Sequence, residues 1–239
     1  MLVAAAVCPC PPLLVPEVAA GAAPELDTLR AACLDAVAVL AAARPDRLVV
    51  VGPAPEDGRG THPQGTAGSF RSLGVDLDVR LGQDGSRDRE EGRRLPQSLA
   101  VAAWLLERTR WATSPVEGLG VGEPLEAARC LEDGRRLADG ADRVALLVMG
   151  DGSACRTVKA PGYLDERAEP FDAAVAEALG AADTGALAAL DAELAAELKA
   201  AGRAPWQVLA GAGESAGLSG QLLYGEAPYG VGYFVASWS

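Results

Sequence analysis

Three short, largely hydrophobic runs, at residues 2–7, 47–51 and 144–149, stand out in the pattern of apolar and polar positions. Runs of this length without regular alternation are typical of strands covered on both faces, as in a parallel sheet. Several longer segments repeat apolar residues at helical spacing: residues 24–44, 95–109, 124–138, 168–182, 184–201 and 205–212. Strands that alternate with helices predict an α/β sandwich with a central, mostly parallel (mixed) sheet flanked by helices. One domain over residues 1–239 is the economical interpretation.

The remaining segments add to the edges of this sheet or connect its parts. Residues 75–81 alternate between apolar and charged side chains, which predicts a half-exposed strand at an edge. Residues 221–224 and 231–238 flank a turn and predict two terminal strands that join antiparallel at an edge. We assign the polar stretch 83–94 and the glycine-rich stretch 118–122 to loops.

Charge and composition argue against several classes of partner. The chain has 239 residues, of which 49% are hydrophobic, and a formal net charge of −12 that is dispersed along the sequence. Nucleic-acid and anionic-membrane surfaces need clustered Lys and Arg, so we expect neither partner. No run of 18 apolar residues is free of charge, so we expect no transmembrane helix. A small molecule, a protein or a second copy of the chain remains as the partner.

The N-terminal stretch and the cysteines bear on the compartment. The first residues are apolar, but no basic residue precedes them and three prolines follow, which indicates a buried strand and not a signal peptide. The five cysteines are an odd number without the spacing of a disulfide framework. We therefore expect a cytoplasmic protein, because thiols stay reduced there.

The loop after the third hydrophobic run, which begins Gly-Asp-Gly-Ser at residue 150, is the first place to look for chemistry. Ligands of open α/β sheets bind beyond the carboxyl ends of the strands. Asp151, Ser153 and Tyr163 are our catalytic candidates, although a turn or a helix cap is the more usual role for such a serine. A serine triad also needs a base, and the single histidine, His62, lies in a segment that we interpret as a surface loop.

Two cysteines, Cys8 and Cys10, lie on the same side of an extended segment at the end of the first run. Their thiolates could hold a soft metal ion, but zinc takes four ligands, and no CxxC or HxxxH partner is present in the sequence. Small buried side chains are the simpler interpretation of both residues.

Four motifs in this order resemble the B-type catalytic subunits of class III extradiol ring-cleavage dioxygenases and their Memo-like relatives. They are Cys-Pro-Cys-Pro-Pro at residues 8–12, Val-Val-Val-Gly-Pro at 49–53, Met-Gly-Asp-Gly-Ser at 149–153 and Tyr-Gly-Val-Gly-Tyr at 229–233. The resemblance covers nearly the whole chain and implies the fold of these extradiol dioxygenases. In active members two histidines and a glutamate hold Fe(II), and a further histidine shuttles protons.

The ligand set that the resemblance implies is missing from this chain. Cys10, Pro55 and Ala154 stand where the family has its three histidines, and Glu214 or Glu226 is the candidate for the late carboxylate. Proline and alanine carry no side-chain donor atom, and a lone thiolate suits softer ions than a ferrous centre that activates O₂. The resemblance therefore implies an inherited fold with lost iron chemistry.

Neighbouring parallel strands end at the same edge of a sheet, so we expect one cleft there. The turns at residues 52–55 and 151–155 should converge with Cys10. Asp151 should be a buried or half-buried carboxylate, held by turn N–H groups or by a charged partner such as Arg156 or Arg167. The residues expected to line the cleft are Cys8, Cys10, Pro53, Pro55, Ala154, Cys155 and Glu214.

Three functions follow from these observations. The one we favour is a fold relative without the iron site, whose old cleft binds a small ligand or a protein partner and which needs no cofactor. The second is an active Fe(II) dioxygenase with a non-standard ligand set. The third is a thiol or soft-metal protein that uses Cys8, Cys10 and Cys155. If any metal binds, Cys10 and His62 are the candidate ligands.

Overall fold

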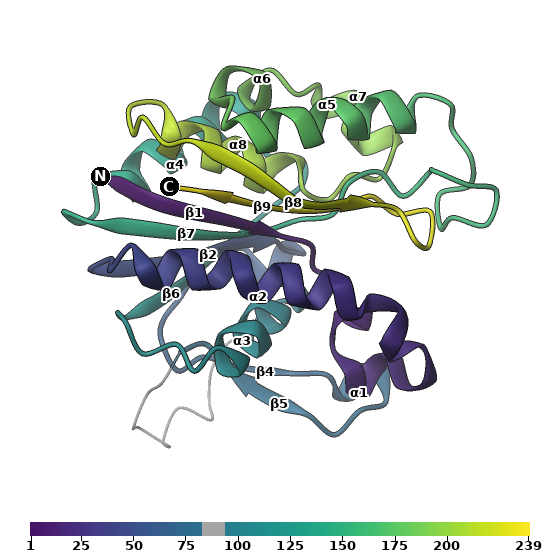
Figure 1. The fold of residues 1–239 in the computed structure, drawn as a ribbon, viewed down its shortest axis with the longest axis horizontal. Coiled ribbons are helices and arrows are strands. Elements are labelled where there is room, and N and C mark those ends of the chain that lie inside the picture. Colours follow the sequence, from purple (N-terminus) through teal and green to yellow (C-terminus); the bar gives the residue numbers. More distant parts are fainter. Residues whose placement is uncertain (83–93) are drawn as a thin grey trace.

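The computed structural model describes residues 1–82 and 94–239, which form an α/β sandwich around a seven-stranded sheet (Figure 1). The strands lie in the order β3-β6-β2-β7-β1-β9-β8, with helices on both faces. The prediction of a mixed, mostly parallel sheet flanked by helices is therefore confirmed. The loop predicted at residues 83–94 lies, except for its last residue, outside the described residues.

Four parallel strands form the centre of the sheet, and three of them are the hydrophobic runs. β1 (Leu2–Cys8) and β2 (Arg47–Pro53) pair with opposite edges of β7 (Val144–Met149). β6 (Val116–Val121) pairs with the other edge of β2. The side chains of the three runs are almost all buried, because helices cover both faces of these strands.

Antiparallel strands complete the two edges of the sheet. β3 (Gly60–His62) pairs with β6 at one edge. β9 (Tyr233–Trp238) pairs with β1, and β8 (Gly220–Glu226) pairs with β9 at the other edge. The two terminal strands are therefore where the sequence predicted them. As a result, β1 lies directly beside β9, although the two are at opposite ends of the sequence.

The helices form one layer on each side of the sheet (Figure 1). One layer holds α2 (Asp27–Ala42) and α3 (Gln97–Arg108), which follow the short helix α1 (Pro16–Ala19). The other layer holds α4 (Ala127–Ala138), α5 (Ala168–Ala181), α6 (Thr184–Ala188), α7 (Ala192–Glu197) and α8 (Arg203–Gly213). Along β1 the side chains alternate between the two layers: Ala4 and Ala6 face the first, and Ala5 and Val7 face the second.

Glycine lets α4 and α8 cross at close range. A Cβ atom at Gly134 would collide with the backbone oxygen of Val208 and would lie 2.7 Å from the backbone nitrogen of Ala212. A Cβ atom at Gly211 would collide with the backbone oxygen of Leu131. The backbones of the two helices therefore touch, and any side chain at these glycines would have to push them apart.

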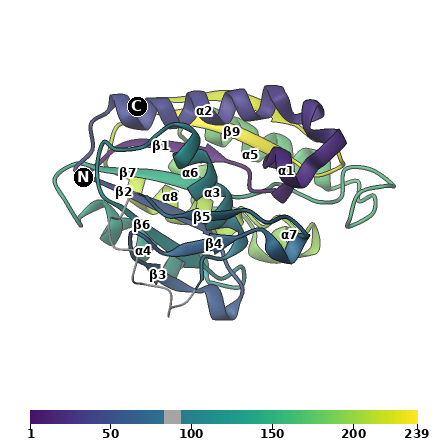
Figure 2. The same cartoon turned by 90° about the horizontal axis from the view of Figure 1, so that it is seen from below.

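The edge strand predicted over residues 75–81 is confirmed in part, because only residues 78–80 are strand and they do not join the main sheet. β5 (Asp78–Arg80) pairs with β4 (Ala67–Ser69) in a separate two-stranded sheet that packs against α3 (Figure 2). The side chains of Phe70, Val79 and Leu81 are fully buried in the core layer that contains α3. The alternating pattern thus indicates that one face of the strand is buried, here against helix α3. It does not indicate which sheet the strand joins.

The assignment of residues 118–122 to a loop is wrong, because most of this stretch is strand β6. A Cβ atom at Gly118 would lie 3.0 Å from the side chains of Leu81 and Leu99. A Cβ atom at Gly120 would collide with the backbone oxygen of Gly58. Gly118 and Gly120 face the same side of the strand, and glycine is needed there because neighbouring segments press closely on that side. The strand therefore lacks the hydrophobic run that would reveal it.

The helix predicted over residues 184–201 is instead the two short helices α6 and α7. Asp191 accepts hydrogen bonds from the backbone N–H groups of Glu193 and Leu194, at 2.8 and 3.1 Å, and so starts a new helix in the middle of the stretch. Among the described residues, no helix has both the length and the apolar character needed to cross a membrane.

Candidate functional site

The carboxyl ends of the parallel strands lie together at one end of the sheet. The Gly150 N–H donates to the carbonyl oxygen of Cys8 at 3.0 Å, and the Ala54 N–H donates to that of Val121 at 2.8 Å. Tyr233, the first residue of the antiparallel strand β9, lies at the same end. The structure thus brings together the connections that follow β1 and β7, with the connection after β2 next to them.

Asp151 joins two of these connections. Its Oδ1 accepts the backbone N–H of Cys10 at 2.7 Å, and its backbone oxygen accepts the N–H of Gly202 just before α8. Burial raises the pKa of Asp151 to about 6, and the hydrogen bonds from Cys10 oppose this rise. The half-buried carboxyl group therefore changes its charge near pH 6. The charged partners suggested by the sequence are wrong, because Arg156 and Arg167 bind other carboxylates.

Three thiols gather beside Asp151, on the side of the sheet that α2 covers. Burial and then the charge of Asp151 raise the pKa of Cys10. Cys8 and Cys33 are fully buried, and burial, followed by the neighbouring Cys8 thiol, raises the pKa of Cys33. The Cys10 and Cys33 thiols are therefore neutral and weakly nucleophilic. The sequence analysis missed Cys33 as a site residue, although its place on the inward stripe of helix 24–44 was visible.

Tyr233 adds a phenol to the same region. Its side chain is buried, and its pKa is raised by burial and then by the charge of Asp151. Because its phenol stays protonated, it remains a hydrogen-bond donor at physiological pH. Nearby, the hydroxyl of Tyr229 donates to the carboxylate of Glu25 at 2.9 Å. The site therefore combines one titrating carboxylate with neutral thiol and phenol groups.

Ser153 does not face this region, and its catalytic role stays a prediction. The side chain is fully buried, and its Oγ donates to Oδ2 of Asp172 at 2.8 Å. The Ser153 N–H donates to Oδ1 of the same carboxylate at 2.8 Å, and Arg156 reaches Oδ2 at 3.3 Å. Burial raises the pKa of Asp172, while the bonds from Ser153 and Arg156 act against this rise. These contacts hold the backbone together and leave no hydroxyl free for a substrate.

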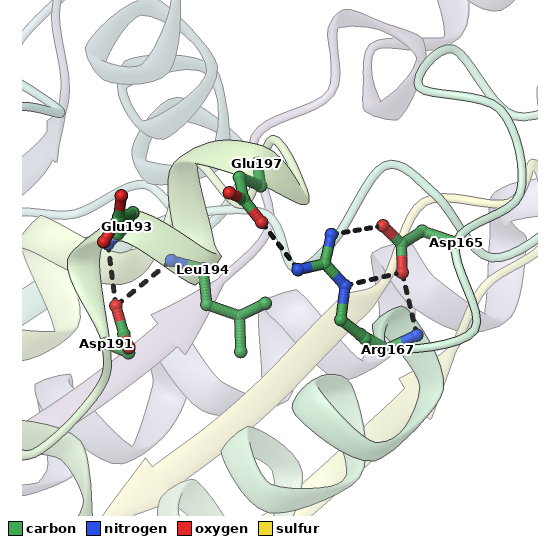
Figure 3. A network of polar contacts seen from close by, with 6 residues as sticks. All are labelled: Asp165, Arg167, Asp191, Glu193, Leu194 and Glu197. Carbon is green, nitrogen blue, oxygen red and sulfur yellow. Dashed lines mark hydrogen bonds and ion pairs between the residues drawn. The ribbon is translucent and has the colours of Figure 1, made fainter.

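Tyr163 is exposed and does not share the buried surroundings of Asp151. Its side chain is 64% exposed, on the loop that leads from β7 to α5, and its backbone has a φ of 64°. Figure 3 shows how that loop is fastened: Arg167 lies between Asp165 at 2.7 Å and Glu197 of α7 at 2.6 Å. Nothing buries Tyr163 or gives it a catalytic partner among the described residues.

The remaining cleft candidates lie in several different places. Pro53 ends β2 at the expected edge, and Pro55 is exposed just beyond it. The Ala154 N–H donates to the carbonyl oxygen of Leu198 at 2.9 Å, and the Cys155 Sγ contacts the same oxygen at 3.5 Å. Cys155 belongs to the core layer under α5 and α8, whereas Cys8 and Cys10 belong to the opposite layer. The sheet therefore separates Cys155 from the other two thiols.

Glu214 lies far from the expected cleft, and so that prediction is wrong. Gly202, just before α8, contacts Asp151, but Glu214 follows the last residue of the helix. At about 1.5 Å per residue, the helix carries Glu214 roughly 18 Å away from Gly202. There it forms a two-pronged ion pair with Arg135 of α4, at 2.7 Å for both bonds. The pair fastens the two helices to each other.

His62 is not a surface loop residue, because it is 1% exposed within β3. Its Nε2 lies 2.8 Å from the carbonyl oxygen of Gly58. The strand order places β3 four strands from β1, which at about 4.8 Å per strand is roughly 19 Å from Cys10. His62 and Cys10 therefore cannot share a metal ion within one chain.

The residues present do not fit the ferrous site that the resemblance implies. Of the positions Cys10, Pro55 and Ala154, only the first carries a side-chain donor atom. Within residues 1–82 and 94–239, no three His, Cys, Asp or Glu side chains form a group that could hold a metal ion. An iron centre that activates O₂ needs about three fixed ligands with open positions beside them.

Comparison with known proteins adds little to this geometry. No family model matches the chain, and no curated protein matches it. Among solved structures, the chain is similar to an uncharacterized protein, JW3007, from Escherichia coli K12, with 13% sequence identity and a TM-score of 0.49. The match covers 99% of this chain and 100% of that one. It assigns neither a family nor an activity.

Proposed function

We propose that this protein is a small-molecule-binding relative of the class III extradiol dioxygenases, without ring-cleavage activity. Its binding site is the edge of the sheet where Asp151, Cys10 and Tyr233 lie together. The observation that carries the proposal is the 2.7 Å hydrogen bond from the Cys10 N–H to Asp151, which ties the connections after β1 and β7 around one titrating carboxyl group. A carboxyl group whose pKa is moved toward neutrality by burial is a common mark of functional sites.

The groups in this site limit the ligand that it can take. Above pH 6 Asp151 is an anion, so it accepts hydrogen bonds and repels another negative charge. The Tyr233 phenol can donate a hydrogen bond to the ligand. We therefore propose a ligand with hydroxyl or amino donors and no carboxylate, such as an uncharged catechol or an aromatic amine.

The absence of ring cleavage rests on the donor set. Without two histidines near Asp151, the site lacks both the family's ligands and its proton shuttle. A soft-metal function has less support, since the sheet separates Cys155 from the thiols of Cys8 and Cys33. Metal analysis of protein purified without chelator should thus give less than one ion per chain, and a stoichiometric metal would contradict the proposal.

Calorimetric titration of the full chain with catechol, dopamine and protocatechuate tests the ligand class. Catechol and dopamine should bind above pH 6, and protocatechuate should bind at least about tenfold more weakly because of its carboxylate. Asp151→Asn should weaken dopamine binding by a similar factor, whereas Asp35→Asn, at an exposed position on α2, should not. Oxygen uptake with Fe(II) and catechol should stay at the background rate. Turnover that disappears on chelation would show the proposal to be wrong.

A further inference from the structure

A hollow lies at the opposite end of the sheet from Asp151. It is a pocket of about 400 Å³ at the amino ends of β2 and β6, bordered by the turn before β7. This volume is within the range of small-molecule pockets, which is about 300–1,000 Å³. The pocket and the carboxyl-end site are built from different strand connections. A ligand bound in the pocket would therefore be independent of the function proposed above.

The walls of the pocket are largely apolar, and its polar lining residues are the ion pair of Arg47 and Glu117 together with Asp46 and Gln64. Pro63, Pro115 and Ala141 line it with flat or small hydrocarbon surfaces. Arg47 of β2 and Glu117 of β6 also line it and are paired with each other across the two neighbouring strands. Both side chains are about one-third exposed, at 29% and 31%, so solvent and ligands can reach them.

The ion pair retains unused hydrogen-bonding capacity. A guanidinium group has five N–H donors, and a carboxylate has about four acceptor positions. Among the residues that the structure describes, Glu117 is the side-chain partner of the Arg47 guanidinium. Arg47 can therefore donate to a ligand oxygen while Glu117 accepts a ligand N–H from the adjacent position. The backbone beside them is fixed, since the Val116 N–H donates to Oε1 of Gln64 at 2.8 Å.

The charges around the pocket favour a neutral ligand. Among the described residues that line it, Asp46 and Glu117 are carboxylates and Arg47 is the cation. An anion would meet a net negative surface, and a cation would have to displace Arg47 from Glu117 or approach its positive charge. A neutral group with an acceptor next to a donor fits both members of the pair without breaking it.

We propose that this pocket binds a flat, neutral molecule that carries an amide edge, a C=O beside an N–H, as in an aromatic carboxamide or a lactam. The carbonyl oxygen accepts from Arg47, the N–H donates to Glu117, and the ring lies against Pro63 and Pro115. The geometry that carries this is the Arg47–Glu117 pair on the wall of a largely apolar pocket.

Benzamide, benzoate and benzylamine form a matched series for the test, because they share one ring and differ in the charge of the polar group. Saturation-transfer NMR of the full chain should show benzamide binding, with benzoate and benzylamine at least about tenfold weaker. Arg47→Met and Ala141→Phe should each weaken benzamide binding by at least about tenfold, the first by removing the donors and the second by filling the pocket.

Two controls make the result specific to this pocket. Arg71→Met removes an exposed arginine that is paired with Asp76 and Asp78 on another part of the molecule, and it should leave benzamide binding unchanged. Asp151→Asn, in the carboxyl-end site, should also leave it unchanged. Equal binding of all three compounds, no binding of benzamide, or full binding to folded Ala141→Phe would each overturn the proposal.

Discussion

The hydroxyl group of Ser153 donates to the carboxylate of Asp172 at 2.8 Å, and both side chains are almost completely buried. The two residues lie on different elements, the connection after β7 and helix α5. A Cβ atom at Gly232, just before β9, would lie 2.5 Å from the same carboxylate, so this third segment packs directly on it. One buried carboxylate therefore fastens three segments that are distant in the sequence.

Replacing Ser153 with alanine should destabilise the protein. The substitution removes the Oγ donor from a carboxylate that is 1% exposed, and a buried charged group that loses a hydrogen bond costs about 1–3 kcal/mol. Urea unfolding followed by circular dichroism measures the loss. Ser72→Ala, at an exposed position, is the control and should change the midpoint little. Equal midpoints for both variants would mean that the buried bond contributes nothing.

Asp151 should make stability depend on pH in a defined window. Its pKa is about 6 in the folded protein and 3.8 in the unfolded reference, so the folded state binds the proton more tightly. The contribution of this group to stability is thus complete below about pH 4 and declines as the pH rises to about 6. The full decline is roughly 2–3 kcal/mol.

The difference in unfolding free energy between wild type and Asp151→Asn isolates this effect, because asparagine does not titrate. We expect the wild type to lose stability relative to the variant between pH 4 and pH 6, and the difference to stay constant above that. Urea unfolding at pH values across this range gives the comparison. A difference that is flat, or that moves in the opposite direction, would contradict the raised pKa.

Gly134→Ala should destabilise the contact between α4 and α8. Its Cβ atom has no space between the helix backbones, and a forced shift of well-packed elements costs about 1–3 kcal/mol. Thermal unfolding should show a lower midpoint. Gly21→Ala is a suitable control, because nothing lies within 4 Å of the added carbon. If Gly134→Ala proved as stable as Gly21→Ala, the helices would have to lie further apart than described.

The thiols should react slowly in the native protein. All five cysteines are free and buried, and burial is the largest cause that raises the pKa of Cys10, Cys33, Cys130 and Cys155. A disulfide reagent such as Ellman's should therefore react at least about tenfold more slowly than with a model thiol. In guanidinium chloride all five should react quickly. A fast-reacting thiol in the native state would reveal an opening at one of these positions.

The central strands could be predicted from the sequence, because the runs at residues 2–7, 47–51 and 144–149 are buried on both faces and carry continuous hydrophobic side chains. β6 could not, because its glycines make room for Gly58 and Leu99, and those neighbours are known only from the fold. The break between α6 and α7 was also not predicted, although Asp191, a residue type that often caps helices, indicates it in the sequence.

Only those parts of the candidate site that follow from the order and direction of the strands could be predicted. The parallel order of β1 and β7 was enough to bring Cys10 and Asp151 together. Strand order does not show on which face of the sheet a side chain lies, and Cys155 lies in the core layer opposite Cys10. Glu214 and His62 were proposed from their positions in the sequence. Those positions do not show that Glu214 lies at the far end of α8 or that His62 lies in the edge strand β3.

The pairing of β1 with β9 has a consequence for how the chain folds during its synthesis. Residues 5–7 have their antiparallel partners at residues 236–238, which the ribosome adds more than two hundred residues later. Until then one edge of β1 has no neighbour and remains open to pairing with another chain. We therefore expect fragments that lack β8 and β9 to aggregate, and the edge of β1 to become protected only once β9 has been synthesised.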